Sequence, residues 1–209
     1  MERISFIMEP RDSHFEQRIA SRIKELRVRR QLTLDDLAKR SGVSRSMISL
    51  IERAESSPTA AVLDKLAASL GVTLASLFAD DEQSEGEPIS RRQDQLTWSD
   101  PESGYIRRNI SPSGFPSAIE LVEVILPART RVAYDSGPRA VAVDQQVWVL
   151  EGEIEVTVGK NVYRLTAGDC LAMKLDLPIV FRNRGRQPTR HLVALTASTA
   201  TAGMFSRRK

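Results

Sequence analysis

The sequence predicts two domains of different fold class, an α-helical domain followed by an all-β domain. Apolar residues recur at helical spacing near the start of the chain, at Phe15, Ile19, Ile23 and Leu26. From about Leu96 they alternate instead with polar residues, in short segments separated by turn residues. Between the two patterns, residues 80–95 hold almost no apolar side chains and cannot bury enough surface to fold alone. We therefore expect a linker there.

The composition is consistent with this division and narrows the function. A chain of 209 residues with 41% hydrophobic content can form two small cores, and a net charge of +3 with a pI of about 9.2 modestly favours a nucleic-acid partner. Cys170 is the only cysteine, which excludes an intrachain disulfide and a cysteine metal cluster. No apolar run approaches the roughly 18 to 20 residues of a membrane span, and residues 1–14, expected to be a loose arm, lack a signal-peptide core. We expect a cytoplasmic protein with no membrane partner.

The helical domain, placed at residues 15–79, contains two short helices joined by a tight turn. Thr33 is a good N-cap with Asp36 three residues later, Gly42 supplies the turn, and Ser44 caps a second helix that runs to about Arg53. The apolar positions between the two helices are Leu37, Val43, Ile48 and Ile51. This pattern predicts a helix-turn-helix, completed to a five-helix bundle by helices that begin near Phe15, Val62 and Thr73.

The exposed start of the second helix suits the recognition of double-stranded DNA. An arginine there can donate two hydrogen bonds to a guanine edge, and short serines allow close approach to bases or phosphates. We predict DNA contacts from Thr33, Ser44, Arg45, Ser46, Ser49 and Arg53. Further cations crowd the first helix and its end, at Arg18, Arg22, Lys24, Arg27, Arg29 and Arg30. The alternatives are a plain helical hairpin and a solvated basic face.

The segment GVSRSMISLIERAESSPT, followed by LDKLAASLGVTLASLFA, resembles the XRE (Cro/repressor-like) family of bacterial DNA-binding domains. The resemblance implies the five-helix pattern over about residues 15–79. One position departs from the family, because Ala54 stands where a glycine usually follows the Ile-Glu-Arg triplet. We expect the chain to leave the second helix of the pair differently there.

The second domain, placed at residues 96–209, is predicted to be a sandwich or barrel of short strands. The segments 119–126, 147–159, 162–165, 170–175, 179–183 and 190–195 are rich in Val, Ile and Leu and are bounded by turn residues. We expect a hairpin around Glu151 and Gly152, with Ile154, Val156 and Val158 facing the interior.

The segments VWVLEGEIEVTVG, YRLTAGDCLAM and LPIVFRN resemble the cupin family, a small jelly-roll β-barrel, over about residues 119–196. An XRE head with a cupin tail is similar to bacterial one-component regulators whose barrel binds a small metabolite. The resemblance also implies a metal site, built from an H-x-H pair, a following Glu and a later His. Here these positions fall at about Arg139 and Val141 (or Pro138 and Ala140), at Gln145 and at Ile179, none of which is a suitable ligand.

The chain holds only two histidines, His14 and His191, so one subunit cannot assemble a multi-histidine site. We therefore expect no metal, no cofactor and no catalytic residue, and we interpret His191 as a strand residue with an ordinary hydrogen bond.

A pocket without its metal suits an organic effector. We predict effector contacts from Tyr134, Arg139, Gln145 and Ile179, with Arg131 as a further candidate. Because Arg139 can pair with a carboxylate, an amino acid, peptide or organic acid is favoured.

The sequence thus predicts a dimeric transcriptional regulator that binds an operator and responds to a small molecule. One alternative is a barrel packed solid that only dimerises the DNA-binding heads, with Trp148 packed internally or at the dimer face. The other is a cupin enzyme that carries a DNA-binding domain. Cys170 is expected to be a small buried hydrophobic residue.

Overall fold

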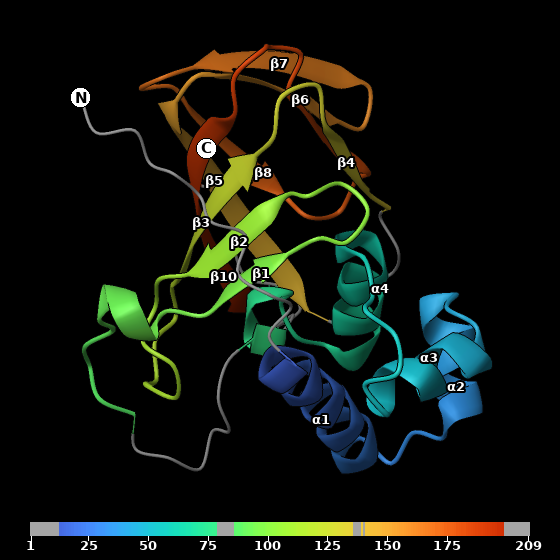
Figure 1. Ribbon diagram of the computed structural model, residues 1–209. Coiled ribbons are helices and arrows are strands. Elements are labelled where there is room, and N and C mark those ends of the chain that lie inside the picture. The colour runs from blue at the N-terminus through green and yellow to red at the C-terminus, as the bar shows by residue number, and fades with distance from the viewer. Residues whose placement is uncertain (1–12, 79–85, 136–138, 140, 199–209) are drawn as a thin grey trace, which may run out of the picture.

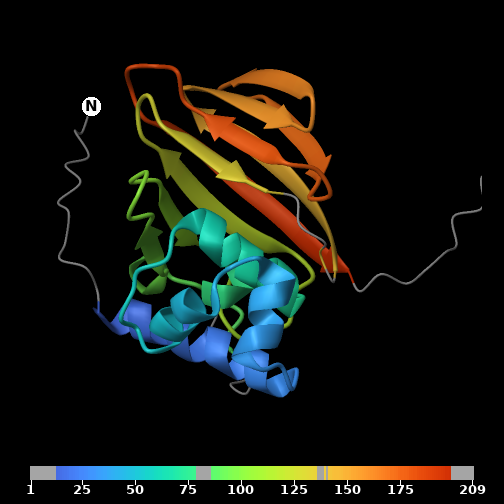
Figure 2. The same ribbon diagram turned by 90° about the vertical axis from the view of Figure 1, so that its right-hand side faces the viewer.

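The computed structural model describes residues 13–78, 86–135, 139 and 141–198, and it places a helical domain against one end of two β-sheets (Figures 1 and 2). The predicted arm at residues 1–14 and residues 80–85 of the predicted linker lie almost entirely outside the described ranges. Within those ranges, no helix combines the length and apolar character needed to span a bilayer. The helices are α1 (Ser13–Arg29), α2 (Leu34–Ser41), α3 (Arg45–Glu52) and α4 (Ala60–Leu70), followed by a 3-10 turn, η1 (Ala75–Phe78).

The start and end signals of α2 and α3 act as the sequence predicts. Thr33 and Asp36 form a reciprocal capping box, in which each side chain binds the other residue's backbone N–H. Hydrogen bonds from Thr33 hold the pKa of the Asp36 carboxyl below its usual range. Gly42 ends α2 in the left-handed conformation, with φ at 67°, and the Ser44 side chain caps α3 at the backbone N–H of Met47. These contacts confirm the helix-turn-helix.

The chain leaves α3 through Ala54, the residue at which the sequence departs from its family. Ala54 has a φ of 55°, in the left-handed region that glycine usually occupies. Its N–H donates to the carbonyl of Ile51, while the N–H of Glu55 donates to that of Leu50, which is the Schellman pattern of helix ends. The turn therefore has the ordinary geometry, with an alanine in a strained position.

The prediction of five helices was wrong for the part of the chain that the structure describes. Residues predicted as the fifth helix form only the turn η1, which is too short for α-helical hydrogen bonding. The Thr73 hydroxyl caps this turn by accepting from the backbone N–H of Ser76. The hydroxyls of Thr73 and Ser76 both donate to the Glu120 carboxylate in the β domain. Because η1 is held from outside, its short length suffices to close the helical core with Leu77 and Phe78.

The β domain consists of two antiparallel sheets. Its described strands are β1 (Thr97–Ser99), β2 (Ile106–Asn109), β3 (Glu120–Leu126), β4 (Arg131–Tyr134), β5 (Ala142–Glu151), β6 (Glu153–Val158), β7 (Asn161–Thr166), β8 (Cys170–Lys174), β9 (Ile179–Arg182) and β10 (Thr189–Ser198). One sheet has the order β1-β2-β3-β10-β5-β8 and the other β4-β9-β6-β7. The side chains of Val147, Val149 and Val156 are fully buried in the core of the domain.

The predicted hairpin at Glu151 and Gly152 was wrong, and of the predicted sandwich or barrel the described residues form two separate sheets that do not close into a barrel. Within the described residues, β5 pairs with β8 and β10, whereas β6 pairs with β7 and β9. Gly152, with a φ of 79° and Thr189 only 3.0 Å from a Cβ placed on it, therefore turns a corner from one sheet to the other. The chain instead makes its hairpin between β6 and β7. The alternation along β6 is confirmed, since Ile154 and Val156 are buried.

The helical domain packs directly against the β domain. The Phe78 ring lies 5.7 Å from the Trp98 ring, which in turn meets Tyr105 edge to face. The backbone N–H of Ala60, at the start of α4, donates to Asp100 at 2.8 Å. Figure 1 shows α4 between the α2–α3 pair and strand β4, so the α2–α3 pair lies on the side remote from the sheets. The two domains thus share one continuous interior.

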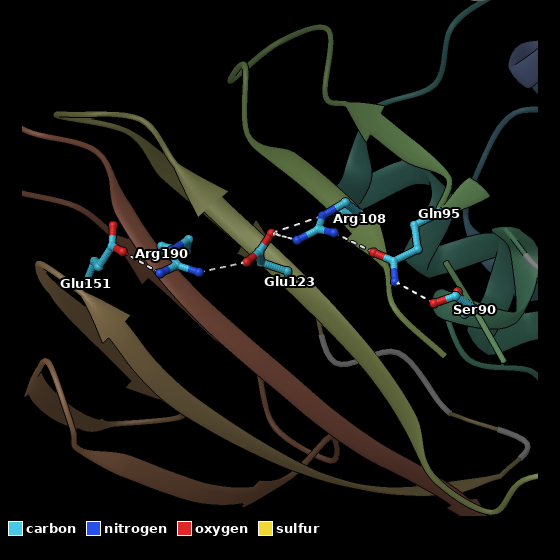
Figure 3. A network of polar contacts seen from close by, with 6 residues as sticks. All are labelled: Ser90, Gln95, Arg108, Glu123, Glu151 and Arg190. Carbon is cyan, nitrogen blue, oxygen red and sulfur yellow. Dashed lines mark hydrogen bonds and ion pairs between the residues drawn. The ribbon is translucent and has the colours of Figure 1, made fainter. Parts of the chain in front are cut away.

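A chain of polar contacts fastens the end of the predicted linker to the six-stranded sheet (Figure 3). Gln95 donates to the carbonyl of Ser90 and accepts from Arg108, and Arg108 and Arg190 both bind the carboxylate of Glu123. Burial alone would raise the pKa of Glu123, but the hydrogen bonds from the two guanidinium groups hold it below its usual range. Residues 90–95 are therefore attached to the sheet.

Candidate functional site

Three of the predicted DNA-contacting residues, Ser44, Arg45 and Ser46, lie at the N-terminal end of α3, whereas Thr33 begins α2 and Arg53 ends α3. Arg45 and Ser46 are exposed, and Ser49 is half-buried one turn later. The Arg45 guanidinium lies 3.4 Å from the Asp35 carboxylate, but both side chains are about two-thirds exposed, so this pair is weak. Thr33 and Ser44 serve as helix caps, and Arg53 is bound to Glu55 and Ser49. Arg45 is thus the group with most freedom to reach a base, and Ser46, whose hydroxyl lies 3.2 Å from that of Ser44, is exposed beside it.

Two arginines of the predicted basic cluster are largely buried and form ion pairs with glutamates. Arg27 binds both carboxylate oxygens of Glu52, at 2.7 and 2.8 Å, and donates to the carbonyl of Leu32. Its side chain is 14% exposed and that of Glu52 is 7% exposed. Arg22 is also buried and pairs with Glu25. Arg27 therefore ties α1 to α3, and the alternative of a solvated basic face does not hold for it.

A cavity of about 60 Å³ lies between the two sheets and is closed on one side by the helical domain. Its lining from the helical domain is Asp64, Thr73 and Leu74. All four residues predicted to contact an effector, Tyr134, Arg139, Gln145 and Ile179, line this cavity. Arg131, the further candidate, is exposed and does not line it. The structure thus brings the predicted group together around one space.

Arg139 was predicted to bind the carboxylate of an effector, but its guanidinium is already bound to a carboxylate of the protein. Its Nη2 lies 2.7 and 3.0 Å from the two carboxylate oxygens of Asp64, on α4, and its Nε donates to the carbonyl of Leu175. Burial raises the pKa of Asp64, and the guanidinium of Arg139 acts in the opposite direction. This pair joins the two domains at the cavity wall.

Arg107, on β2, is a second buried cation at the cavity, and its charge has no such partner. It is 6% exposed, and its Nε and Nη2 are buried without a hydrogen-bond partner. Its Nη1 makes only a long, 3.5 Å contact to the Tyr105 hydroxyl, and its Cζ lies 5.7 Å from the centre of the Phe78 ring. A buried cation in this state is costly in free energy, so it requires an explanation.

His191 differs from its predicted role as an ordinary strand residue. It is 2% exposed, lines the cavity beside Gln145, and stacks on the Phe181 ring with 5.9 Å between ring centres. Its Nδ1 has no hydrogen-bond partner. Burial, together with the charge of Arg107, lowers the pKa of His191 to about 4. The imidazole is therefore neutral near pH 7.

Comparisons with known proteins agree with this architecture. A family model described as helix-turn-helix matches residues 23–77, and a model described as cupin domain matches residues 142–195. The HTH-type transcriptional regulator SutR of Escherichia coli is 29% identical, over 81% of this chain and 89% of its own length. The HTH-type transcriptional regulator PuuR of Escherichia coli is 28% identical, over 85% and 94%. The chain thus carries an XRE-type helix-turn-helix domain and a cupin domain, and these curated relatives are HTH-type transcriptional regulators.

A solved structure supports the regulator's overall arrangement as well. The crystal structure of an HTH_3 family transcriptional regulator from Vibrio cholerae aligns with a TM-score of 0.69 and 26% identity, covering 88% of this chain and 97% of that one. The likeness therefore extends over both domains.

The regulator's cavity residues do not fit the metal site that cupins often carry. Of the corresponding positions, Ile179 and Val141 offer no donor atom, and Arg139 is a cation engaged with Asp64. Gln145 alone has an oxygen to offer, and divalent iron, manganese and zinc require several nitrogen, oxygen or sulfur ligands. Among the described residues, no three His, Cys, Asp or Glu side chains come together to hold a metal.

Sequence reasoning missed Asp64, Tyr105 and Arg107 as residues of the cavity. A weak signal exists for the last two, since Tyr105 and Arg107 lie two residues apart and so share one face of a strand. Asp64 also had a signal, since it falls at helical spacing with the buried Ala60 and Ala67 of α4, but its partner Arg139 could not be predicted from that spacing. Cys170 was also misjudged, since it is exposed, with its Sγ 3.8 Å from the Gln146 side-chain oxygen.

Proposed function

We propose that this cytoplasmic regulator is a homodimer that reads a double-stranded operator with α3 and changes its DNA affinity when a small molecule binds the cavity. The observation that carries the proposal is the shared lining of the cavity. Asp64 and Leu74 of the helical domain face it together with Gln145 and His191 of the cupin domain. A ligand there contacts both domains, so it can favour one relative arrangement of the DNA-reading head over another.

The DNA part of the proposal rests on Arg45 and Ser46. Both lie at the exposed N-terminal end of α3, where recognition helices meet base edges in the major groove. We expect Arg45→Ala to lose discrimination at one G·C pair, at a cost of about 1 to 3 kcal/mol. Lys39→Ala, an exposed cation on α2, is the matched control and should weaken all sequences alike. If Arg45→Ala lowered the affinity for selected and random DNA equally, Arg45 would not contact a base.

The homodimer is supported by an exposed aromatic residue on the outer face of the six-stranded sheet. Trp148 is 47% exposed and lies opposite Cys170 on β8 and Leu192 on β10. Large exposed apolar groups of this kind often mark interfaces. If two heads bind two half-sites, Trp148→Glu should give a monomer by sedimentation and weaker operator binding, with the fold unchanged by circular dichroism. A dimer that persists would place the interface elsewhere.

The effector part is tested by operator binding with and without ligand. The operator is selected from a random DNA library, and ligands are found by thermal shift, because binding to the folded form raises the melting temperature. Gln145→Ala should abolish the ligand's effect on fluorescence anisotropy and leave ligand-free DNA affinity almost unchanged. A wild-type protein whose DNA affinity ignores every stabilising ligand would favour a cupin domain that serves only for dimerisation. The neutral His191 and the absent ligand set give an enzymatic role no support.

A further inference from the structure

The charges around the cavity do not cancel. Asp64 and Arg139 neutralise each other, and the carboxylate of Asp135 is paired with Lys65 at 2.9 Å. His191, with a pKa of about 4, is uncharged near pH 7. Among the described residues that line the cavity, Arg107 therefore remains as one uncompensated positive charge.

The unmet groups of Arg107 form a recognisable binding edge. The nitrogens without a partner are Nε and Nη2, whose N–H groups point along one edge of the planar guanidinium and can donate to the two oxygens of a carboxylate as a fork. Nδ1 of His191 is a further buried polar atom without a partner, and Arg107 is close enough to lower the pKa of that ring. In its Nδ1–H tautomer, the ring adds another donor. These groups together call for an anion with several acceptor oxygens.

The rest of the cavity limits what that anion can be. A volume of about 60 Å³ holds roughly four to six water-sized groups, which excludes a peptide. Much of the lining is apolar, including Val124, Val143 and Val193. An inorganic ion gains nothing from such walls, whereas a small organic acid buries its hydrocarbon part against them.

We infer that the cavity binds a small organic monocarboxylate, with its carboxylate held by Nε and Nη2 of Arg107. The inference rests on the proposed effector role of the cavity and supplies the chemical class of the effector. It assigns to Arg107 the role that the sequence suggested for Arg139, which Asp64 already occupies. Arg107 also lies over the ring of Phe78 in η1. A bound carboxylate that neutralises the guanidinium therefore alters this contact between the cupin domain and the helical domain.

Binding is measured by isothermal titration and thermal shift with acetate, propionate and butyrate, which have about four to six non-hydrogen atoms. Propionamide, propylamine, chloride and inorganic phosphate are the comparison probes. The variants are Arg107→Met, Arg107→Lys and, as a matched control, Arg131→Met, an exposed arginine that does not line the cavity. Anisotropy on the selected operator is recorded for each combination.

We expect the carboxylates to stabilise the wild type and Arg131→Met, and the amide, amine and inorganic ions not to. Arg107→Met should lose about 10- to 100-fold in carboxylate affinity, and Arg107→Lys should lose less. Without ligand, Arg107→Met should melt no lower than the wild type, because it removes an unpaired buried charge. A structural arginine would show the opposite, so a lower ligand-free melting temperature counts against the inference.

Each remaining result is decisive for one of the two proposals. Equal stabilisation by propionamide or propylamine, carboxylate binding that survives in Arg107→Met, or no carboxylate binding at all would overturn the anion site. Carboxylate binding that depends on Arg107 but leaves operator affinity unchanged would uphold the anion site and overturn the effector role of the cavity.

Discussion

Two buried arginine–carboxylate pairs look alike but join different parts of the molecule. Arg27 and Glu52 are 14% and 7% exposed and connect α1 to α3 within the head. Arg139 and Asp64 are 10% and 7% exposed and connect the cupin domain to α4, across 75 residues of sequence. The first pair stabilises the DNA-reading unit itself. The second makes the position of that unit depend on a residue in the wall of the cavity.

Breaking the pair inside the head should have the largest effect. Arg27→Met leaves the Glu52 carboxylate buried and unpaired, and it should lower the free energy of unfolding by about 3 to 5 kcal/mol. DNA binding should fall with the folded fraction, for selected and random sequences alike. Urea denaturation followed by circular dichroism measures the loss.

Arg29→Ala is the control for this experiment, because it removes a more exposed arginine of the same helix, paired with Glu25. We expect a change below about 1 kcal/mol. A loss of that small size in Arg27→Met would mean that the pair with Glu52 contributes no more than a surface contact.

Breaking the pair between the domains should cost slightly less and act elsewhere. Asp64→Asn keeps the shape of the side chain and an acceptor for Arg139, so we expect a loss of about 2 to 4 kcal/mol. The head should remain folded while its contact with the cupin domain weakens. Trypsin should then cleave faster after the exposed Arg91 and Arg92.

The matched control is Asp135→Asn, which breaks an exposed pair with Lys65 at the same interface. Its cleavage rate should stay close to that of the wild type. Equal acceleration in the two variants would show that the buried position of Asp64 confers no special role in docking.

The contrast between the two pairs also explains how far the sequence could predict this molecule. The caps at Thr33 and Ser44 and the turn at Gly42 depend on residues within four positions of each other, so the α2–α3 unit was predictable in detail. The Asp64–Arg139 pair and the corner at Gly152 depend on distant partners that no local pattern reveals. The alternation of β3 to β10 predicted an all-β domain but could not show which strands pair.

The cavity illustrates the same limit. The family pattern brought Gln145, Arg139 and Ile179 to the lining of one cavity, since it carries long-range information. It could not show that Arg139 is already bound to Asp64, because that partner comes from the other domain. Arg107 lies on a strand of only four residues, too short for a recognisable period.

The cavity should make the regulator sensitive to acid through His191. His191 has a folded-state pKa of about 4, below its unfolded value near 6.5. The neutral ring therefore contributes stability that is present above about pH 6.5 and is lost as the pH falls toward 4, by up to about 3 kcal/mol. His191→Phe keeps the stack on Phe181 and should flatten this part of the profile. Unfolding free energies measured between pH 4 and 7 test it, and an equally steep profile in His191→Phe would assign the acid sensitivity to other groups.

The smallest expected effect concerns whether the two domains unfold together. Ala54 in the head and Arg129 in the cupin domain both have positive φ, at 55° and 58°. A non-glycine residue in this region destabilises the folded state by roughly 1 to 2 kcal/mol. Glycine removes that strain, but its greater backbone freedom stabilises the unfolded chain by about 0.5 to 1 kcal/mol. Ala54→Gly and Arg129→Gly should therefore each stabilise by about 0.5 to 1 kcal/mol. Because Phe78, Trp98 and the Asp64–Arg139 pair join the domains, we expect one calorimetric transition that both substitutions raise. Two transitions, with each substitution raising only its own, would show that the shared interior does not couple the domains.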